Sequence, residues 1–363
     1  MTGRARIRQR LARLREALER ARVDALLITS VPNVTYLSGF TGEDSALVVT
    51  GRQSVLITDS RYTEQAAAEC PEARVHEHRQ GLLGAVTRLV RRRGLSRVGF
   101  EESMPHGWYV ELRSALGARR LVLQGAVVER QRQVKDAGEV GAIRRALAVG
   151  ESWWGRRRRL LRPGRTEREV AAELVYAMCR SGAQGEAFAP IVAVGGRASL
   201  PHARPGGRRL GPGRPVLLDW GAAVGSYKCD LTRVLAPSRM TARFREVYGT
   251  VLEAQEAAIA AVRPGVTAGS VDAAARRIIT RAGYGKQFGH GLGHGVGLEV
   301  HELPRIRKRD GTILQPGMVF TIEPGIYLPG RIGVRIEDMV LVTRRGCEVL
   351  SSLPKRLEDV ILG

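Results

Sequence analysis

Four acidic residues in the C-terminal half occupy matching positions in two similar segments. A segment ending Val-Leu-Leu-Asp219-Trp-Gly matches one ending Phe-Thr-Ile-Glu323-Pro-Gly, so that Asp219 falls on Glu323, 104 residues further on. A second acid follows in each case, Asp230 in the first copy and Glu337 in the second. Carboxylates held close together repel one another unless cations balance their charge. The repeated pattern therefore predicts a metal centre.

A glycine-rich segment supplies candidate nitrogen ligands. Residues 288–302 contain five glycines and three of the seven histidines of the chain, His290, His294 and His301. Glycine allows a close approach of the backbone to a site, and three histidines in such a segment favour a functional role over a structural one. His202 is a weaker candidate, because a loop histidine explains it equally well. Three histidines lack such a context and are expected at the surface: His76, His78 and His106.

One imidazole and four carboxylates form a mostly oxygen ligand set, which suits Mn²⁺, Co²⁺ or Zn²⁺ better than a thiol-binding metal. Two divalent cations would balance four carboxylates. They would also lower the pKa of bound water and so supply a nucleophile for amide hydrolysis. Ion pairs with Arg233 or Arg335 are the alternative, but they account for one acid better than for four.

Strands are expected to position these acids. Residues 216–219 and 228–234 have the pattern of two strands of a hairpin, which would bring the two aspartates together. Residues 334–337 have the pattern of a further strand, whose period of two puts Arg335 and Glu337 on one face.

A second repeat precedes the acids. Arg-Pro-Gly-Arg-Thr166 matches Arg-Pro-Gly-Val-Thr267, 101 residues further on. Each copy predicts a helix end at Pro-Gly, a threonine cap and a second helix. Two matches at nearly equal offsets and in the same order indicate two α+β halves related by a pseudo-twofold axis, whereas chance similarity of Pro-Gly turns would explain only one.

The N-terminal part alternates helix and strand patterns, which predicts an α/β domain over residues 1–130, followed by a second domain over residues 131–363. Ile7, Leu11, Leu14 and Leu18 mark an amphipathic first helix. The expected strands are short apolar runs: 25–28, 46–49, 55–57, 97–100 and 121–123.

Composition excludes several classes of protein. The chain has 363 residues, 44% of them hydrophobic, which predicts a globular protein rather than a disordered one. No run reaches about 18 apolar residues, so no membrane span is expected. Four cysteines without a CxxC pair indicate neither a zinc ribbon nor a disulfide framework, and they fit a cytoplasmic location.

The net charge of +22 comes almost entirely from arginine. The arginines are scattered apart from runs at 91–93 and 156–159, whereas nucleic-acid binding favours basic clusters interleaved with aromatic residues. A solvated basic surface is therefore expected, and no specific nucleic-acid partner.

These motifs together resemble the pita-bread metallopeptidases, specifically the bacterial Xaa-Pro aminopeptidase and prolidase group, over nearly the whole chain. The resemblance implies a creatinase-like N-terminal α/β domain followed by a pseudo-twofold pita-bread catalytic domain. The segments that carry it are Asn33–Phe40, Thr58–Tyr62, His290–Gly297, Glu323–Tyr327 and Gly333–Asp338.

The resemblance also implies a role for each residue of the site. Asp219 would hold one metal alone, His294 and Glu323 would hold the other, and both would be bridged by the remaining two acids, Asp230 and Glu337. Glu323 would transfer a proton to the departing proline nitrogen. Four further residues would serve the substrate: His202 and His301 would stabilise the tetrahedral intermediate, and His290 and Arg335 would flank the proline pocket.

The function expected from the resemblance is an Xaa-Pro aminopeptidase with two divalent ions, Mn²⁺ being favoured, that acts as a homodimer on peptides with proline in second position. Prolidase, the same chemistry restricted to dipeptides, is the alternative. Methionine aminopeptidase lacks so large an N-terminal domain of this type, and creatinase lacks the complete ligand set. A non-catalytic binding module would be expected to have lost ligands.

Overall fold

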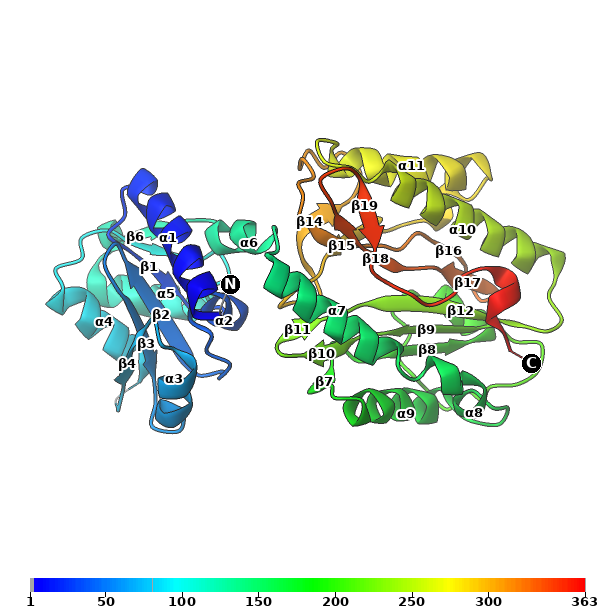
Figure 1. Cartoon of the computed structure of the whole chain (residues 1–363), viewed down its shortest axis with the longest axis horizontal. Coiled ribbons are helices and arrows are strands. Elements are labelled where there is room, and N and C mark those ends of the chain that lie inside the picture. Colours follow the sequence, from blue (N-terminus) through cyan, green and yellow to red (C-terminus); the bar gives the residue numbers. More distant parts are fainter. Residues whose placement is uncertain (1–2, 80, 363) are drawn as a thin grey trace. The chain divides into compact units, whose positions relative to one another are not determined.

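The computed structural model describes residues 3–79 and 81–362. The chain divides into two compact units, residues 1–132 and residues 133–363 (Figure 1). We propose that these units are the two domains expected from the sequence. No helix within the described ranges is long and apolar enough to cross a membrane.

Unit 1 alternates helices and strands around a six-stranded sheet of order β4-β3-β2-β1-β5-β6. The amphipathic pattern of its first helix is confirmed, because Ile7, Leu11, Leu14 and Leu18 are all buried. Its helices and strands are α1 (Gly3–Ala21), β1 (Ala25–Ile28), α2 (Val31–Ser38), β2 (Ser45–Thr50), β3 (Ser54–Thr58), α3 (Thr63–Glu69), β4 (Arg74–Glu77), α4 (Leu82–Arg92), β5 (Val98–Phe100), α5 (His106–Leu116), β6 (Leu121–Leu123) and α6 (Val127–Arg132).

The five strands expected in unit 1 are all present, and β4 is an addition. β4 lies at the sheet edge and pairs in parallel with β3 only. Its sequence, Arg-Val-His-Glu, is largely exposed. An edge strand with one apolar residue gives no hydrophobic run, so sequence patterns could not predict it.

Unit 2 combines helices with several small, mostly antiparallel sheets, which confirms the α+β prediction. Figure 1 shows its strands between α9 on one side and α10 and α11 on the other. Its helices and strands are α7 (Ala137–Glu151), α8 (Arg157–Leu160), α9 (Glu167–Arg180), β7 (Gly185–Glu186), β8 (Ile191–Val194), β9 (Val216–Trp220), β10 (Ala222–Val224), β11 (Tyr227–Lys228), β12 (Leu231–Pro237), α10 (Ala242–Ala261), α11 (Ala268–Arg281), β13 (Gly293–Gly295), β14 (Glu302–Ile306), β15 (Val319–Ile322), β16 (Gly325–Leu328), β17 (Ile332–Arg335), β18 (Asp338–Val342), β19 (Cys347–Val349) and β20 (Ile361–Leu362).

The two halves of unit 2 repeat the same local contacts. α9 and α11 each have 14 residues, and a threonine caps each of them, Thr166 and Thr267. The backbone N–H of Gly164 donates to Leu210 at 2.9 Å, and the N–H of Gly265 donates to Leu314, also at 2.9 Å. Repeated hydrogen bonds between repeated positions show that the internal similarity is structural and not a coincidence of Pro-Gly turns.

The strand pattern around the second acid of each half differs from the expectation. The strand expected over residues 228–234 is interrupted, because β11 ends at Lys228 and β12 begins at Leu231. The strand expected over residues 334–337 is also wrong in extent, because β17 ends at Arg335. Both acids therefore lie in breaks between strands, where a side chain is freed from the alternation of an extended ladder.

The two threonine caps should contribute similarly to stability. We expect Thr166→Ala and Thr267→Ala each to lower the free energy of unfolding by about 1 kcal/mol, because each removes a side-chain acceptor from a helix N-terminus. Urea unfolding followed by circular dichroism measures the change. Thr250→Ala, inside α10, is the control and should be neutral or stabilising because alanine is the better helix former. Equal effects of all three changes would contradict the capping role.

Candidate metal centre

The acids of the predicted centre lie in or next to strands of both halves of unit 2. Asp219 lies on β9, opposite Thr232 of β12 in an antiparallel pair. Glu323 directly follows β15, the equivalent strand of the second half. The side chains of Asp219, Asp230 and Glu337 are buried, and that of Glu323 is largely so.

The histidine of the site is brought in by a strand that packs unusually close to its neighbours. His294 lies on β13, which pairs with β14 and β15. A Cβ on Gly293 would lie 1.9 Å from the carbonyl oxygen of Thr321, and one on Gly295 would lie 2.1 Å from that of Leu303. Only glycine fits on either side of His294, which explains these two glycines of the segment.

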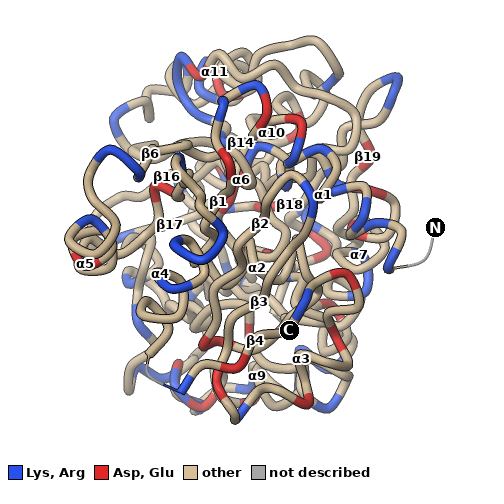
Figure 2. Tube along the Cα trace, turned by 90° about the vertical axis from the view of Figure 1, so that its left-hand side faces the viewer, with Lys and Arg blue, Asp and Glu red and all other residues tan. Residues whose placement is uncertain are grey.

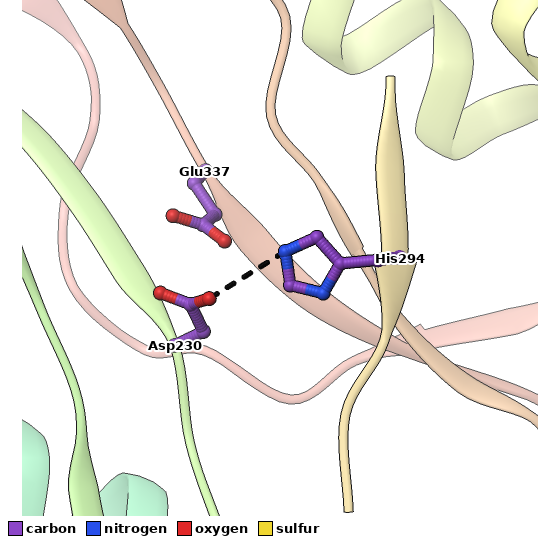
Figure 3. A group of neighbouring side chains, drawn as sticks. All are labelled: Asp230, His294 and Glu337. Atoms are coloured by element: carbon purple, nitrogen blue, oxygen red, sulfur yellow. Dashed lines mark ion pairs between the residues drawn. The ribbon is translucent and has the colours of Figure 1, made fainter. Parts of the chain in front are cut away.

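Three of the predicted ligands converge tightly. One ligand atom from each of Asp230, His294 and Glu337 lies within 4.8 Å of the others (Figure 3). His294 Nε2 is 3.6 Å from Asp230 Oδ2 and 3.2 Å from Glu323 Oε1. The four residues therefore surround one small volume.

The imidazole of His294 is oriented for coordination. Its Nδ1 lies 3.2 Å from the carbonyl oxygen of Gly295. If Nδ1 carries the proton and donates to that oxygen, Nε2 presents a lone pair to the carboxylates. A backbone acceptor that fixes the tautomer in this way is the usual arrangement for a metal-binding histidine.

Arg335 belongs to the same cluster. Its guanidinium donates to Asp219 Oδ2 at 2.5 Å and lies 3.9 Å from Glu323 Oε2. The alternative expected from the sequence, an ion pair between Arg335 and an acid, is thus correct for Asp219. Arg233 instead pairs with Asp338, at 2.7 Å. One guanidinium carries a single positive charge against four carboxyl groups, so the cluster could accommodate further cations.

Burial and the repulsion between neighbouring carboxylates shift the pKa values of the acids in this cluster. Burial, followed by the charges of Glu337 and Asp219, raises the pKa of Asp230 well above its usual range. Burial and the charges of Glu323 and Asp219 raise the pKa of Glu337 in the same way. At Glu323 burial is outweighed by the hydrogen bond and charge of His294, which lower its pKa to about 2. Two cations would relieve the repulsion that burial imposes.

Two buried carboxylate oxygens of the site, Asp219 Oδ1 and Glu337 Oε1, have no hydrogen-bond partner among the described residues. Buried carboxylate oxygens are costly to leave unsatisfied. Asp219 uses its other oxygen to accept from Arg335, and Glu337 uses its other oxygen to accept from Thr232 at 2.6 Å. The unsatisfied atoms are of the type that hard divalent cations prefer, so the residues fit a metal centre.

The remaining predicted residues surround this cluster at different distances. The rings of His301 and His294 are 4.1 Å apart between centroids. Burial, with the charge of His294, lowers the pKa of His301 to about 4. His290 Nε2 lies 3.0 Å from the hydroxyl of Tyr327. His202 is exposed, and its charge is among the causes that lower the pKa of His301.

Three polar residues of the site had no role in the sequence analysis. Thr232 donates to Glu337 and accepts from Arg335 Nε at 3.0 Å. The hydroxyl of Tyr327 accepts from Arg335 at 2.8 Å. Thr321 accepts from the backbone N–H of His294 and donates to Glu323. Thr232 and Thr321 each lie two residues from an acid, and in the sequence this spacing is the signal that could have predicted a role for them in the site.

Comparison with known proteins gives the same result. The profile of metallopeptidase family M24 matches residues 141–344, and that of the Creatinase/Prolidase N-terminal domain matches residues 10–134. An Xaa-Pro dipeptidase of Pyrococcus horikoshii is 35% identical over 96% of this chain and 98% of its own.

Solved structures agree over the whole chain. An Xaa-Pro dipeptidase from Bacillus anthracis has a TM-score of 0.93 at 35% identity, covering 98% of this chain and 99% of its own. An X-Pro aminopeptidase from Thermotoga maritima MSB8 has a TM-score of 0.86 at 38% identity, covering 94% and 99%.

This chain belongs to the metallopeptidase family M24. It is therefore a metal-dependent peptidase, a hydrolase, and it combines a creatinase-like N-terminal domain with the pita-bread catalytic fold. The metallopeptidase family and the two-domain fold that the resemblance implied are therefore confirmed.

Removing one buried acid should separate charge repulsion from metal binding. In metal-free protein we expect Glu337→Gln to raise the free energy of unfolding by about 1 kcal/mol, roughly 2–4 °C in Tm, because a crowded carboxylate is lost. The variant should also lose the rise in Tm that Mn²⁺ gives the wild type. Thermal unfolding with and without Mn²⁺ measures both effects.

Glu253→Gln is the matched control for this change, because Glu253 is an exposed acid on α10. It should behave as the wild type under both conditions. A Glu337→Gln protein that Mn²⁺ stabilises as much as the wild type would show that this carboxylate does not bind metal.

Thr232 should matter for metal affinity although it is not a predicted ligand. We expect Thr232→Val, which keeps the side-chain shape, to weaken Mn²⁺ binding by about tenfold or more, because Glu337 and Arg335 both lose a partner. Thr232→Ser keeps the hydroxyl and should restore most of the affinity. Calorimetric titration of metal-free protein with Mn²⁺ measures both, and equal affinities of the two variants would contradict the role of the hydroxyl.

Proposed function

We propose that this chain is an Xaa-Pro dipeptidase, a prolidase that uses two divalent ions. The observation that carries the proposal is the convergence of the predicted ligands in unit 2 together with two buried carboxylate oxygens that lack partners. The names of several relatives and structural neighbours support the substrate class, since they are Xaa-Pro dipeptidases or prolidases.

The proposed metal ligands are those implied by the resemblance. Asp219 would bind one ion, His294 and Glu323 would bind the other, and both ions would share Asp230 and Glu337. Mn²⁺ is favoured, with Co²⁺ or Zn²⁺ as alternatives, because the set has four carboxylates and one imidazole. When bound, the ions would lower the pKa of water and polarise the carbonyl of the scissile bond.

The protein residues would handle the proton and the developing charge. Glu323 would accept the proton from the attacking water and deliver it to the proline nitrogen as the C–N bond breaks. Its lowered pKa in the described site keeps the carboxylate ionised, which is the form that can take up a proton. His301 and His202 would donate hydrogen bonds to the oxygen that gains negative charge.

Proline suits this site on chemical grounds. An Xaa-Pro bond is a tertiary amide without an N–H, so the site needs no acceptor for that group. We assign the proline pocket to His290 and Arg335, and Tyr327 joins the two through hydrogen bonds of 3.0 Å and 2.8 Å. These contacts hold both side chains in fixed positions before the substrate arrives.

The proposed dipeptidase activity differs from the main expectation of the sequence analysis, which was an Xaa-Pro aminopeptidase. Aminopeptidase activity is not confirmed, and the dipeptidase alternative has more support from named relatives. The X-Pro aminopeptidase of similar structure keeps aminopeptidase activity as the second candidate. A homodimer, a cytoplasmic location and the absence of a specific nucleic-acid partner stay predictions.

Substrate length gives the decisive test. With Mn²⁺-loaded protein, we expect kcat/KM for Met-Pro to exceed that for Met-Pro-Ala by about tenfold or more, with Met-Ala as the control for proline specificity. Chelator should remove the activity and Mn²⁺ should restore it. Faster cleavage of the tripeptide would favour the aminopeptidase, and equal cleavage of Met-Ala would reject proline specificity.

Glu323 should be essential for turnover. We expect Glu323→Gln to lower kcat by about a hundredfold or more, because an amide cannot accept the proton. Circular dichroism should show an intact fold, and Glu253→Gln should retain full activity. Substantial turnover by a folded Glu323→Gln protein would contradict the proposed proton transfer.

A further inference from the structure

A basic cleft of about 460 Å³ lies at the β4 edge of unit 1. Five of its eleven lining residues are arginine and two are histidine. Lysine and arginine together make up only 58 of the 363 residues of the chain. The cleft is thus far more basic than the chain as a whole, and folding brings Arg74 and Arg79 beside the arginines of residues 88–93.

The register of the sheet explains how the cleft forms. Arg74 pairs with Val55 and His76 pairs with Ile57, so these β4 side chains lie on the same face as two core residues. That core packs against α4, since Val55 and Ile57 share a hydrophobic cluster with residues of that helix. The strand edge therefore presents Arg74 and His76 beside α4.

α4 supplies the opposite wall. Arg88 and Arg92 are four residues apart and so lie on one face of the helix, beside the apolar Ala85 and Leu89 that form the floor of the cleft. Figure 2 shows basic positions along α4. Residues from a strand edge and from a helix thus face one small volume.

Several arginines of the cleft have no acidic partner among the described residues. Within residues 3–79 and 81–362, Arg74, Arg88 and Arg92 form no ion pair. The one acid of the lining, Glu77, lies 3.5 Å from Arg79. Unpaired guanidinium groups that line one cleft would attract an anion.

The helix dipole does not account for the whole cluster. It favours basic residues in the last turn of α4, including Arg92. It gives no reason for Arg74 on the strand or Arg88 one turn earlier. His78, expected at the surface, is half-buried, and its Nδ1 is buried without a hydrogen-bond partner among the described residues.

We propose that this cleft binds a compact, multiply charged phosphate anion. Guanidinium groups match phosphate oxygens in charge and in hydrogen-bond geometry. The lining contains no Phe, Tyr or Trp, so it offers no platform for stacking bases, which argues against single-stranded nucleic acid. The site lies wholly in unit 1 and is independent of the peptidase proposal.

Inorganic tripolyphosphate is the probe, titrated calorimetrically into the full-length protein at 0.15 M salt. We expect Arg88→Gln/Arg92→Gln to weaken binding by about tenfold or more relative to wild type. The matched control is Arg119→Gln/Arg120→Gln, which removes the same charge from exposed residues of unit 1 before β6, at the other sheet edge. It should weaken binding by less than about twofold.

Both double variants keep the metal ligands, so any removal of bound ions by the titrant is common to all three proteins. Hydrogen exchange should show protection of β4 and α4 by tripolyphosphate in the wild type and in the control. The proposal is overturned if tripolyphosphate does not bind, or if the two double variants lose binding equally. It is also overturned if a single-stranded RNA binds more tightly and displaces tripolyphosphate.

Discussion

Burial of four carboxylates around one imidazole is the constraint on which the rest of unit 2 depends. Burial and mutual repulsion raise the pKa of Asp230 and Glu337, and one guanidinium, that of Arg335, offsets only part of the charge. Such an arrangement is unfavourable by itself and becomes favourable when cations enter. The energy of metal binding thus offsets a cost that is built into the folded chain.

The internal duplication explains how one chain brings these acids together. Each half contributes one acid from a strand of the same type, Asp219 on β9 and Glu323 after β15, and a second acid from a break between strands. Thr232 joins the halves, because it lies on β12 of the first half and bonds to Glu337 and Arg335 of the second. The proposed ion sites would therefore draw ligands from both halves and require the complete unit.

Sequence reasoning predicted what depends on residue type and spacing. The duplicated acids, the glycine-flanked His294 and the apolar strands of unit 1 all carry local signals. The strand breaks at Asp230 and Glu337 carry none, because neighbouring apolar residues continue the alternation. The pairing of Arg335 with Asp219, 116 positions away, and the edge strand β4 depend on tertiary contacts that no local pattern records.

The most direct measurement is anomalous X-ray diffraction from crystals of the Mn²⁺-loaded protein at the manganese edge. The account predicts two peaks about 3.5–4 Å apart, both within the space bounded by the two aspartates, His294 and the two glutamates. A map with no peak there, or with manganese bound only elsewhere on the chain, would contradict the view that these carboxylates are buried in order to hold a pair of cations.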